Sequence, residues 1–298
     1  MMNEELKKQL RNRGICVIIP TYNNDTTIKT VVEKSLLYCD DVIVVTDGCT
    51  DRTTNILDAI DGITIVSYPQ NRGKGYALKM GLRKALEMGF SYAITLDGDG
   101  QHYPEDIPLF LKANQEYPQS LIIGSRQLEG VDRSKGSSFA NKFSNFWFYV
   151  QTGRALPDTQ TGYRLYPLHR LCGLSLLTSR YEAELELLVF ASWHGVKLIP
   201  IPVQVYYPPR NERVSHFRPG KDFARISVLN TVLCFLAVVY GLPLRLWRTL
   251  MTFLRTAYSL LFFLFFTLVV FTPFVWIYTK IGKMTERRRY RLHQLIYH

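Results

Sequence analysis

Residues 15–48 read ICVIIPTYNNDTTIKTVVEKSLLYCDDVIVVTDG and outline a strand, a helix and a second strand. The run ICVIIP (15–20) is apolar without alternation, as is typical of a strand buried on both faces. Asp25 is placed to cap a helix that runs through Leu37. The run DVIVVTDG (41–48) then predicts a second strand that ends in a turn.

The same alternation continues to about residue 206. Further strands are predicted at 63–69, 92–97 and 121–126, and helices at 51–60, at 75–89 and from Pro104. We therefore expect an α/β domain with a mainly parallel sheet. Ligands of such sheets bind beyond the carboxyl ends of the strands.

Polar clusters follow four of these strands and should meet at one edge of the sheet. They are PTYN (20–23), Asp47-Gly48, NRGKG (71–75) and DGD (97–99). Asp47 could bind the base or ribose of a nucleotide, whereas Asp51 is expected to cap the next helix. NRGKG resembles a phosphate loop but matches neither common motif, and alone it is typical of a surface turn.

The stretch LDGDGQHYPED (96–106) places two carboxylates directly after a buried strand. In an extended segment Asp97 and Asp99 point to the same side, and Gln101 continues the row. Two close carboxylates repel unless a cation lies between them, and oxygen ligands suit Mg²⁺ or Mn²⁺. A solvated Asp-Gly turn is the alternative, which the neighbouring clusters disfavour.

Six motifs occur in the order found in family 2 glycosyltransferases. They are PTYNN (20–24), VTDGCTD (45–51), NRGKGYALKMG (71–81), LDGDGQHYPED (96–106), GSR (124–126) and DTQTGYRLY (158–166). Over roughly residues 14–217 the chain most resembles the dolichol-phosphate mannosyltransferase branch. The resemblance implies a GT-A fold, a GDP- or UDP-linked sugar donor, Mg²⁺ or Mn²⁺, and inversion at the anomeric carbon.

The resemblance also implies roles for individual residues. It places Pro20, Tyr22 and Asp47 at the nucleotide, Asp97, Asp99 and Gln101 at the metal and diphosphate, and Arg126, Asp158 and Arg213 near the reacting groups. From the strand-end clusters, Asn23 and Lys74 join the nucleotide set. The chain departs from the branch at NERVSHF (211–217), where His216 replaces a lysine, and at Asn24, where glutamate is common. The departures leave the donor and the acceptor open.

Two helical stretches have competing interpretations. RYEAELELLVFASWHG (180–195) predicts an amphipathic helix with two of its three glutamates in solvent, although Glu182 or Glu184 could face the acceptor. The aromatic residues of 139–150 are Phe143, Phe146, Trp147, Phe148 and Tyr149. They are explained either by packing or by an interfacial surface that touches lipid.

The composition changes after residue 225. Residues 227–244 and 259–279 are uncharged and long enough to span a membrane. We expect a catalytic domain (1–225), a two-helix membrane hairpin (226–280) and a basic tail (281–298), with both ends of the hairpin in the cytoplasm because basic residues flank it. Three loop arginines (245, 248 and 255) leave shallow or re-entrant helices open, and a buried core helix is a further alternative.

Charge and cysteine content limit the classes of protein. The net charge of +11 suits a polyanionic partner or a cytoplasmic membrane protein. Five cysteines without a CxxC pair disfavour a disulfide framework or a zinc site, and the charged N-terminus shows no signal peptide.

The leading hypothesis is an inverting hexosyltransferase of the cell envelope that moves a sugar from a nucleotide to a membrane lipid, with a polyprenyl phosphate as the expected acceptor. Such a phosphate is already ionised at neutral pH, so Asp158 would orient groups. A lipid or saccharide hydroxyl would instead need Asp158 or Glu182 as a base.

A sugar-phosphate nucleotidyltransferase is a more remote alternative, because PTYNND (20–25) is not a glycine-rich loop with an arginine. A nucleic-acid-binding protein or an inert scaffold fits the aligned aspartates poorly. Homo-oligomers and a domain beyond residue 298 stay open.

Overall fold

This computed structural model describes residues 2–126, 135–174, 176–206 and 219–274, together with residues 276, 278, 280 and 283. The chain divides into two compact units, Met1–Leu242 and Pro243–His298. The first unit is built on a seven-stranded sheet with the strand order β3-β2-β1-β4-β6-β5-β7. The predicted α/β class is confirmed.

The strands are β1 (Ile15–Thr21), β2 (Val42–Asp47), β3 (Ile63–Tyr68), β4 (Tyr92–Thr95), β5 (Leu121–Arg126), β6 (Arg164–Pro167) and β7 (Leu198–Val203). All pairings are parallel except those of β6, which lies antiparallel between β4 and β5. Every residue of β1, β2 and β4 is buried, which confirms the interpretation of the continuous apolar runs. β6 and β7 are not among the predicted strands. β6 is short and begins with an arginine, and the two prolines of β7 are tolerated because it is an edge strand.

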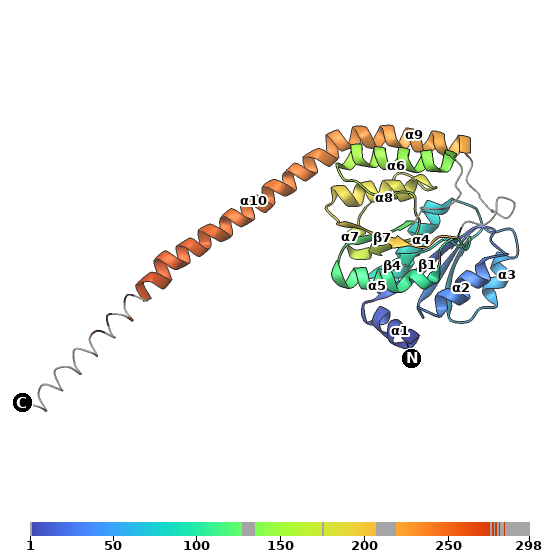
Figure 1. Cartoon of the computed structure of the whole chain (residues 1–298), viewed down its shortest axis with the longest axis horizontal. Coiled ribbons are helices and arrows are strands. Elements are labelled where there is room, and N and C mark those ends of the chain that lie inside the picture. Colours follow the sequence, from blue (N-terminus) through green and yellow to red (C-terminus); the bar gives the residue numbers. More distant parts are fainter. Residues whose placement is uncertain are drawn as a thin grey trace, which may run out of the picture. The chain divides into compact units, whose positions relative to one another are not determined.

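Helices cover both faces of the sheet (Figure 1). In the first unit they are α1 (Met2–Asn12), α2 (Ile28–Leu36), α3 (Thr53–Asp58), α4 (Lys74–Glu87), η1 (Pro104–Asp106), α5 (Ile107–Glu116), α6 (Lys135–Thr152), α7 (Leu168–Leu171), α8 (Glu182–Trp193), α9 (Pro219–Leu236) and the π-helical turn η2 (Ala237–Gly241). The core cluster joins the strands to α1, α2 and α5. α4 packs on β1 and β2, while α6, α8 and α9 contact one another.

Asp25 does not cap α2, which begins three residues after it, at Ile28, with Thr27 at the cap position. The carboxylate of Asp25 instead pairs with Arg52, and its backbone N–H donates to the carboxylate of Asp51. Asp51 also accepts the backbone N–H of Thr53 at the start of α3. Arg52, not Asp51, therefore stands at the cap position of α3, but the Asp51 carboxylate still accepts the first free amide of the helix and also holds the loop after β1.

The prediction that two of the α8 glutamates are solvated is wrong. Glu182, Glu184 and Glu186 are 7%, 8% and 0% exposed. α8 is not amphipathic, because it packs against α4, α6 and α9 and is buried on all sides. Each of its carboxylates therefore lies in an interior where a charge needs partners.

The predicted hairpin is corrected to a single long helix. α9 and η2 continue directly into α10 (Leu242–Phe265) and the π-helical η3 (Phe266–Phe271). Residues Ala224–Phe265 form one helix that is long and apolar enough to cross a membrane by length and composition. No glycine or proline lies between Leu244 and Thr272, so the sequence offers no residue that would turn the chain back there.

Candidate active site

The polar clusters do meet at one edge of the sheet. β1 pairs with β2 from Val17 through Thr21, and β1 pairs with β4 up to Thr95. These three parallel strands therefore end side by side, and Asp47 and Asp97 lie at or just past their carboxyl ends. Asp99 is not in an extended segment, since β4 ends at Thr95 and Gly98–Asp99 form a turn.

Asp47 holds the loop that precedes α4. Its two carboxylate oxygens accept the backbone N–H groups of Arg72, at 2.7 Å, and of Gly73, at 2.8 Å. Asp47 is 2% exposed. The N–H groups of Arg72 and Gly73, which a phosphate loop would present to its ligand, are therefore already bonded to the Asp47 carboxylate.

The two glycines of NRGKG are required by packing. A Cβ at Gly73 would lie 2.5 Å from Cγ of Arg180, and one at Gly75 would lie 2.3 Å from Cβ of Ala183. The Tyr76 N–H donates to the carbonyl of Ser179 at 2.7 Å. The start of α4 therefore packs closely against the segment that leads into α8. This packing accounts for both glycines of NRGKG without a bound phosphate.

Lys74 is held between two carboxylates. Its Nζ lies 2.7 Å from Oδ1 of Asp97 and 3.2 Å from Oε1 of Glu184. Burial by itself would lower the pKa of Lys74, but the two carboxylates raise it above its usual range. Burial would raise the pKa of Asp97, and the charge of Lys74 lowers it instead. The group is a buried ion triplet at the predicted donor site.

The loop of the DTQTG motif closes over this triplet. A Cβ at Gly162 would lie 2.8 Å from Nζ of Lys74 and 3.0 Å from Oδ2 of Asp97. The hydroxyl of Thr95 donates to the carbonyl of Gly162 at 2.7 Å. The fully buried Arg164 donates to the carbonyls of Thr159 and Glu184, and so ties the loop to α8.

Asp99 lies beside the triplet, and within the described part of the chain no lysine, arginine or histidine forms an ion pair with it. Its Oδ1 accepts the backbone N–H of Gln101 at 3.0 Å. Burial, followed by the negative charge of Asp97, raises the pKa of Asp99 to about 6. A carboxylate in this state would be stabilised by a divalent cation.

The carboxylates of this site fit a metal ion that is bound partly by the protein and partly by a substrate. Within the described residues, no three side chains of His, Cys, Asp or Glu form a group that could hold a metal ion. Mg²⁺ is commonly bound through one or two carboxylates, with water and substrate phosphates completing the shell. Asp97 and Asp99 fit that pattern, and the backbone of Gln101 is fixed by the bond to Asp99 and by one from Tyr206 N–H.

His102 belongs to the site although the sequence interpretation assigns it no role. Its Nδ1 accepts the backbone N–H of Asp97 at 3.2 Å. Burial lowers the pKa of His102 to about 4, so the ring is neutral at pH 7. A neutral acceptor at this position fixes the backbone of Asp97. The available signal was its place within the motif, five residues after Asp97.

Arg126 and Asp158 are brought together as a pair. The Arg126 guanidinium donates to both oxygens of Asp158, which is fully buried. Asp158 also accepts the backbone N–H of Gln160 at 3.1 Å. Both oxygens are therefore engaged, which suits an orienting role better than proton abstraction.

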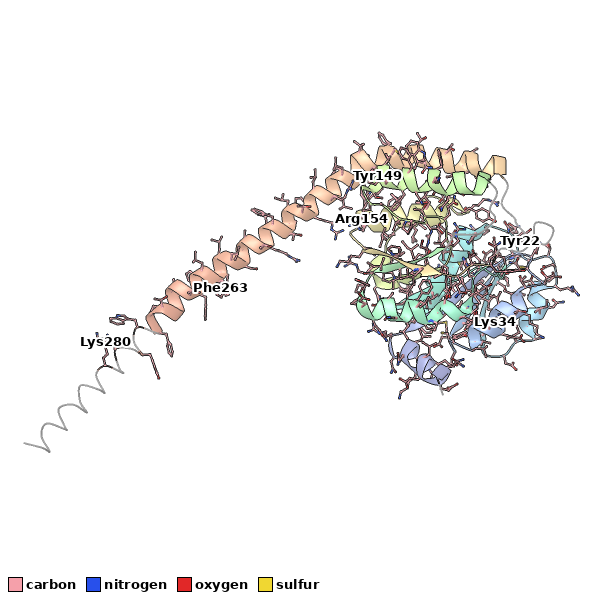
Figure 2. The ribbon with its side chains drawn as sticks, in the orientation of Figure 1. Tyr22, Lys34, Tyr149, Arg154, Phe263 and Lys280 are labelled. Carbon is pink, nitrogen blue, oxygen red and sulfur yellow. The ribbon has the colours of Figure 1, made fainter. Side chains whose placement is uncertain are left out.

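Glu182 lies at the start of α8, and its Oε2 is buried without a hydrogen-bond partner among the described residues. Arg213, Ser215 and His216 lie outside those residues. The remaining predicted residues stand on and after β1. Pro20 is buried in the strand, and Tyr22 follows it (Figure 2). Asn23 has a positive φ of 51° and exchanges hydrogen bonds with Thr50.

Comparison with known proteins gives a family match. The sequence profile of Glycosyl transferase family 2 matches residues 16–166. A UDP-N-acetylglucosamine–dolichyl-phosphate N-acetylglucosaminyltransferase of Methanococcus voltae is 29% identical over 221 residues, which cover 66% of this chain and 88% of that protein. The polyprenol monophosphomannose synthase of Mycolicibacterium smegmatis is 29% identical over 63% of this chain and 75% of its own. An undecaprenyl-phosphate mannosyltransferase of Micrococcus luteus is 26% identical over 63% and 82%.

Solved structures show the same fold. Glucosyl-3-phosphoglycerate synthase from Mycobacterium tuberculosis, in complex with Mn²⁺, uridine diphosphate and phosphoglyceric acid, has a TM-score of 0.59 at 19% identity, covering 79% of this chain and 82% of that one. Its complex with Mg²⁺ and uridine diphosphate has a TM-score of 0.56 at 20% identity, covering 79% and 83%. The sheet seen here is therefore the GT-A-like sheet of that enzyme.

Proposed function

Because the chain belongs to glycosyl transferase family 2, we propose that it transfers a sugar from a nucleoside diphosphate to a polyprenyl phosphate in a membrane, with inversion at the anomeric carbon. The observation that carries the proposal is the meeting of Asp47, Asp97 and Asp99 at one sheet edge beside the Arg126–Asp158 pair. Three relatives named for dolichyl, polyprenol or undecaprenyl phosphate acceptors support the choice of acceptor.

In this mechanism each carboxylate of the donor site has a separate task. Asp97 and Asp99 would hold Mg²⁺ or Mn²⁺, which when bound would neutralise charge on the leaving nucleoside diphosphate. Asp47 shapes the loop that carries Lys74, and Lys74 adds a fixed positive charge near the same place. Whether the nucleotide is UDP or GDP is decided by residues that contact the base, for which Pro20, Tyr22 and Asn23 are the candidates.

On the acceptor side, Asp158 holds the Arg126 guanidinium in a fixed plane. An ionised phosphate acceptor supplies its own nucleophilic oxygen and needs cations to offset its repulsion from the donor diphosphate. Arg126 would supply that charge, and Arg213 is proposed for the same task. Both oxygens of Asp158 already accept hydrogen bonds, so this residue is poorly placed to act as a base. This supports a phosphate acceptor, because such an acceptor requires no base.

An apolar surface next to the DTQTG motif supports a membrane-bound acceptor. α6 and α9 lie side by side (Figure 1). Their exposed apolar side chains are Phe146, Tyr149, Val150, Val228, Val232 and Phe235, of which Tyr149 is labelled in Figure 2. Asn145 of α6 bonds both the carbonyl of Pro157 and the N–H of Thr159. The helix that offers apolar side chains thus also holds the residues on either side of Asp158. We propose that this surface rests on the bilayer and that the exposed apolar side chains of α10 also contact the membrane.

The test is an assay on the full chain in lipid vesicles. UDP- and GDP-linked radiolabelled sugars are supplied with undecaprenyl or dolichyl phosphate, or with the corresponding free alcohol. We expect label to enter the organic phase only with a phosphate acceptor, and to be lost in Asp99→Asn and in chelator. Label on the free alcohol alone would contradict the phosphate acceptor.

One observation favours a second candidate, transfer to a lipid or saccharide hydroxyl. The buried Oε2 of Glu182 has no partner among the described residues and could accept a proton from an acceptor hydroxyl. In that case Glu182→Gln would abolish transfer to the alcohol. With a phosphate acceptor the same change would leave most of the turnover.

A further inference from the structure

The ammonium of Lys74 is paired with the carboxylate of Asp97, which is a proposed ligand of the divalent metal. It lies 2.7 Å from Oδ1 of Asp97 and 3.2 Å from Oε1 of Glu184. The Lys74 side chain is 20% exposed and that of Glu184 is 10% exposed, so solvent screens the group only weakly. Asp97 therefore already has a cation when no substrate is present.

We propose that Lys74 is a resident counter-cation that competes with the divalent metal for Asp97, and that Glu184 is the positioning residue that keeps the ammonium in place when Asp97 turns to the metal. The inference rests on the proposed function, because it takes Asp97 as a metal ligand. It adds a role for Glu184 and a coupling between the metal and the nucleotide.

The main chain around the triplet is fixed, so only side chains can exchange partners. Asp47 accepts the N–H of Gly73, just before α4, and the carbonyl of Ser179 accepts the N–H of Tyr76, in its first turn. Arg164 holds the carbonyl of Glu184 at 2.8 Å. Because Glu184 already contacts Nζ, the ammonium can leave Asp97 without losing all of its compensating charge.

Charge then couples metal binding to nucleotide binding. A divalent cation and an ammonium on one carboxylate repel each other strongly in a poorly screened site. A nucleoside diphosphate brings negative charge that both cations can share. Metal alone should therefore bind weakly, and each ligand should increase the affinity of the other by the same factor.

A purely structural ion triplet makes a different prediction. If Lys74 and Glu184 only stabilised the fold, replacing either would weaken metal binding in the same direction. If Lys74 is a counter-cation and Glu184 positions it, replacing the two residues has opposite effects on metal affinity. Lys74→Gln frees Asp97, whereas Glu184→Gln leaves Lys74 with Asp97 as its remaining carboxylate partner.

The experiment measures Mn²⁺ binding to the full chain in detergent by the electron paramagnetic resonance signal of free Mn²⁺, with and without UDP or GDP. For Lys74→Gln we expect roughly tenfold tighter Mn²⁺ binding without nucleotide and a smaller gain on adding nucleotide. For Glu184→Gln we expect weaker binding without nucleotide. Melting curves check that each variant is folded.

Glu186→Gln is the matched control. Glu186 lies on the same helix and is fully buried, but it accepts the backbone N–H groups of Leu177 and Thr178 instead of Lys74. Its replacement should lower the melting temperature and leave Mn²⁺ affinity unchanged. If Lys74→Gln does not fold, the double variant Lys74→Gln/Glu184→Gln should bind Mn²⁺ more tightly than Glu184→Gln alone.

The outcomes separate the two levels of inference. Weaker Mn²⁺ binding in both single variants, or an unchanged affinity and coupling in Lys74→Gln, would overturn the counter-cation and leave the proposed transferase intact. A wild-type chain that binds no Mn²⁺ even with nucleotide would overturn the metal role itself.

Discussion

The guanidinium of Arg126, at the end of β5, donates two hydrogen bonds to the buried carboxylate of Asp158, from Nε to Oδ2 at 2.5 Å and from Nη2 to Oδ1 at 2.9 Å. The two residues come from different motifs and form one unit. Removing either partner leaves the other buried with an uncompensated charge or an unmatched donor. The effect of a single substitution at either position therefore includes the cost of leaving the partner unmatched.

For Asp158→Asn we expect a stability loss of at most about 3–5 kcal/mol, because the amide N–H₂ would face the donors of Arg126. With a polyprenyl phosphate acceptor, folded enzyme should keep a measurable fraction of its turnover. Its rise in rate near pH 6 should survive, since this limb belongs to the acceptor phosphate. Rates at saturating Mn²⁺ across pH 5–8 test this, beside melting curves. Loss of that limb in Asp158→Asn would instead assign proton abstraction to Asp158.

The pH dependence of metal binding should follow Asp99. Its pKa is raised to about 6, so below that pH a metal ion must displace a proton. We expect Mn²⁺ affinity without nucleotide to be level above pH 6 and to fall about tenfold for each unit below it. Binding measured from pH 5 to 7.5 gives the profile. Asp99→Asn should bind more weakly and lose this slope, and an unchanged slope in that variant would place the titrating group elsewhere.

Gly162→Ala should disrupt the donor site. The new methyl group would lie 2.8 Å from Nζ of Lys74 and 3.0 Å from Oδ2 of Asp97, so the ion pair must move. We expect a loss of about 1–3 kcal/mol in stability and a large loss of nucleotide affinity in the presence of Mn²⁺. Calorimetry and thermal melts measure the two effects. Gly220→Ala is the control, since a Cβ there meets nothing within 4 Å, and it should be neutral.

The apolar surface of α6 predicts a kinetic effect specific to lipid. Phe146 and Tyr149 are 57% and 56% exposed, so Phe146→Ser/Tyr149→Ser should leave the melting temperature unchanged. We expect a several-fold higher KM for long-chain polyprenyl phosphate in vesicles and no change for a short, water-soluble acceptor. Leu37→Ser, at an exposed position after α2, serves as the control. Equal effects on both acceptors would remove the membrane-contact role of this surface.

Much of the proposed donor site follows from the sequence because parallel strands have a fixed geometry. Continuous apolar runs located β1, β2 and β4, and their carboxyl ends meet at one edge of the sheet. The sequence alone therefore predicts that Asp47, Asp97 and Asp99 lie close together. Residues whose position depends on packing were less predictable. The prediction that two of the three α8 glutamates lie in solvent is wrong because helix periodicity describes one apolar face, and α8 has neighbours on every side.

By itself, the sequence determined the α/β class, the sheet edge at which the aspartates lie and the apolar character of the C-terminal segment. Each of these features depends on residues that are close together in the sequence. The tertiary structure alone decided what surrounds Lys74. The insertion of β6 antiparallel between β4 and β5 brings Gly162 over the Lys74–Asp97 pair, and the burial of α8 adds Glu184. The apolar character of the C-terminal segment leaves one helix or two open, and the structure shows one helix from Ala224 to Phe265. Contacts between distant segments depend on strand order and helix packing, which no local pattern encodes.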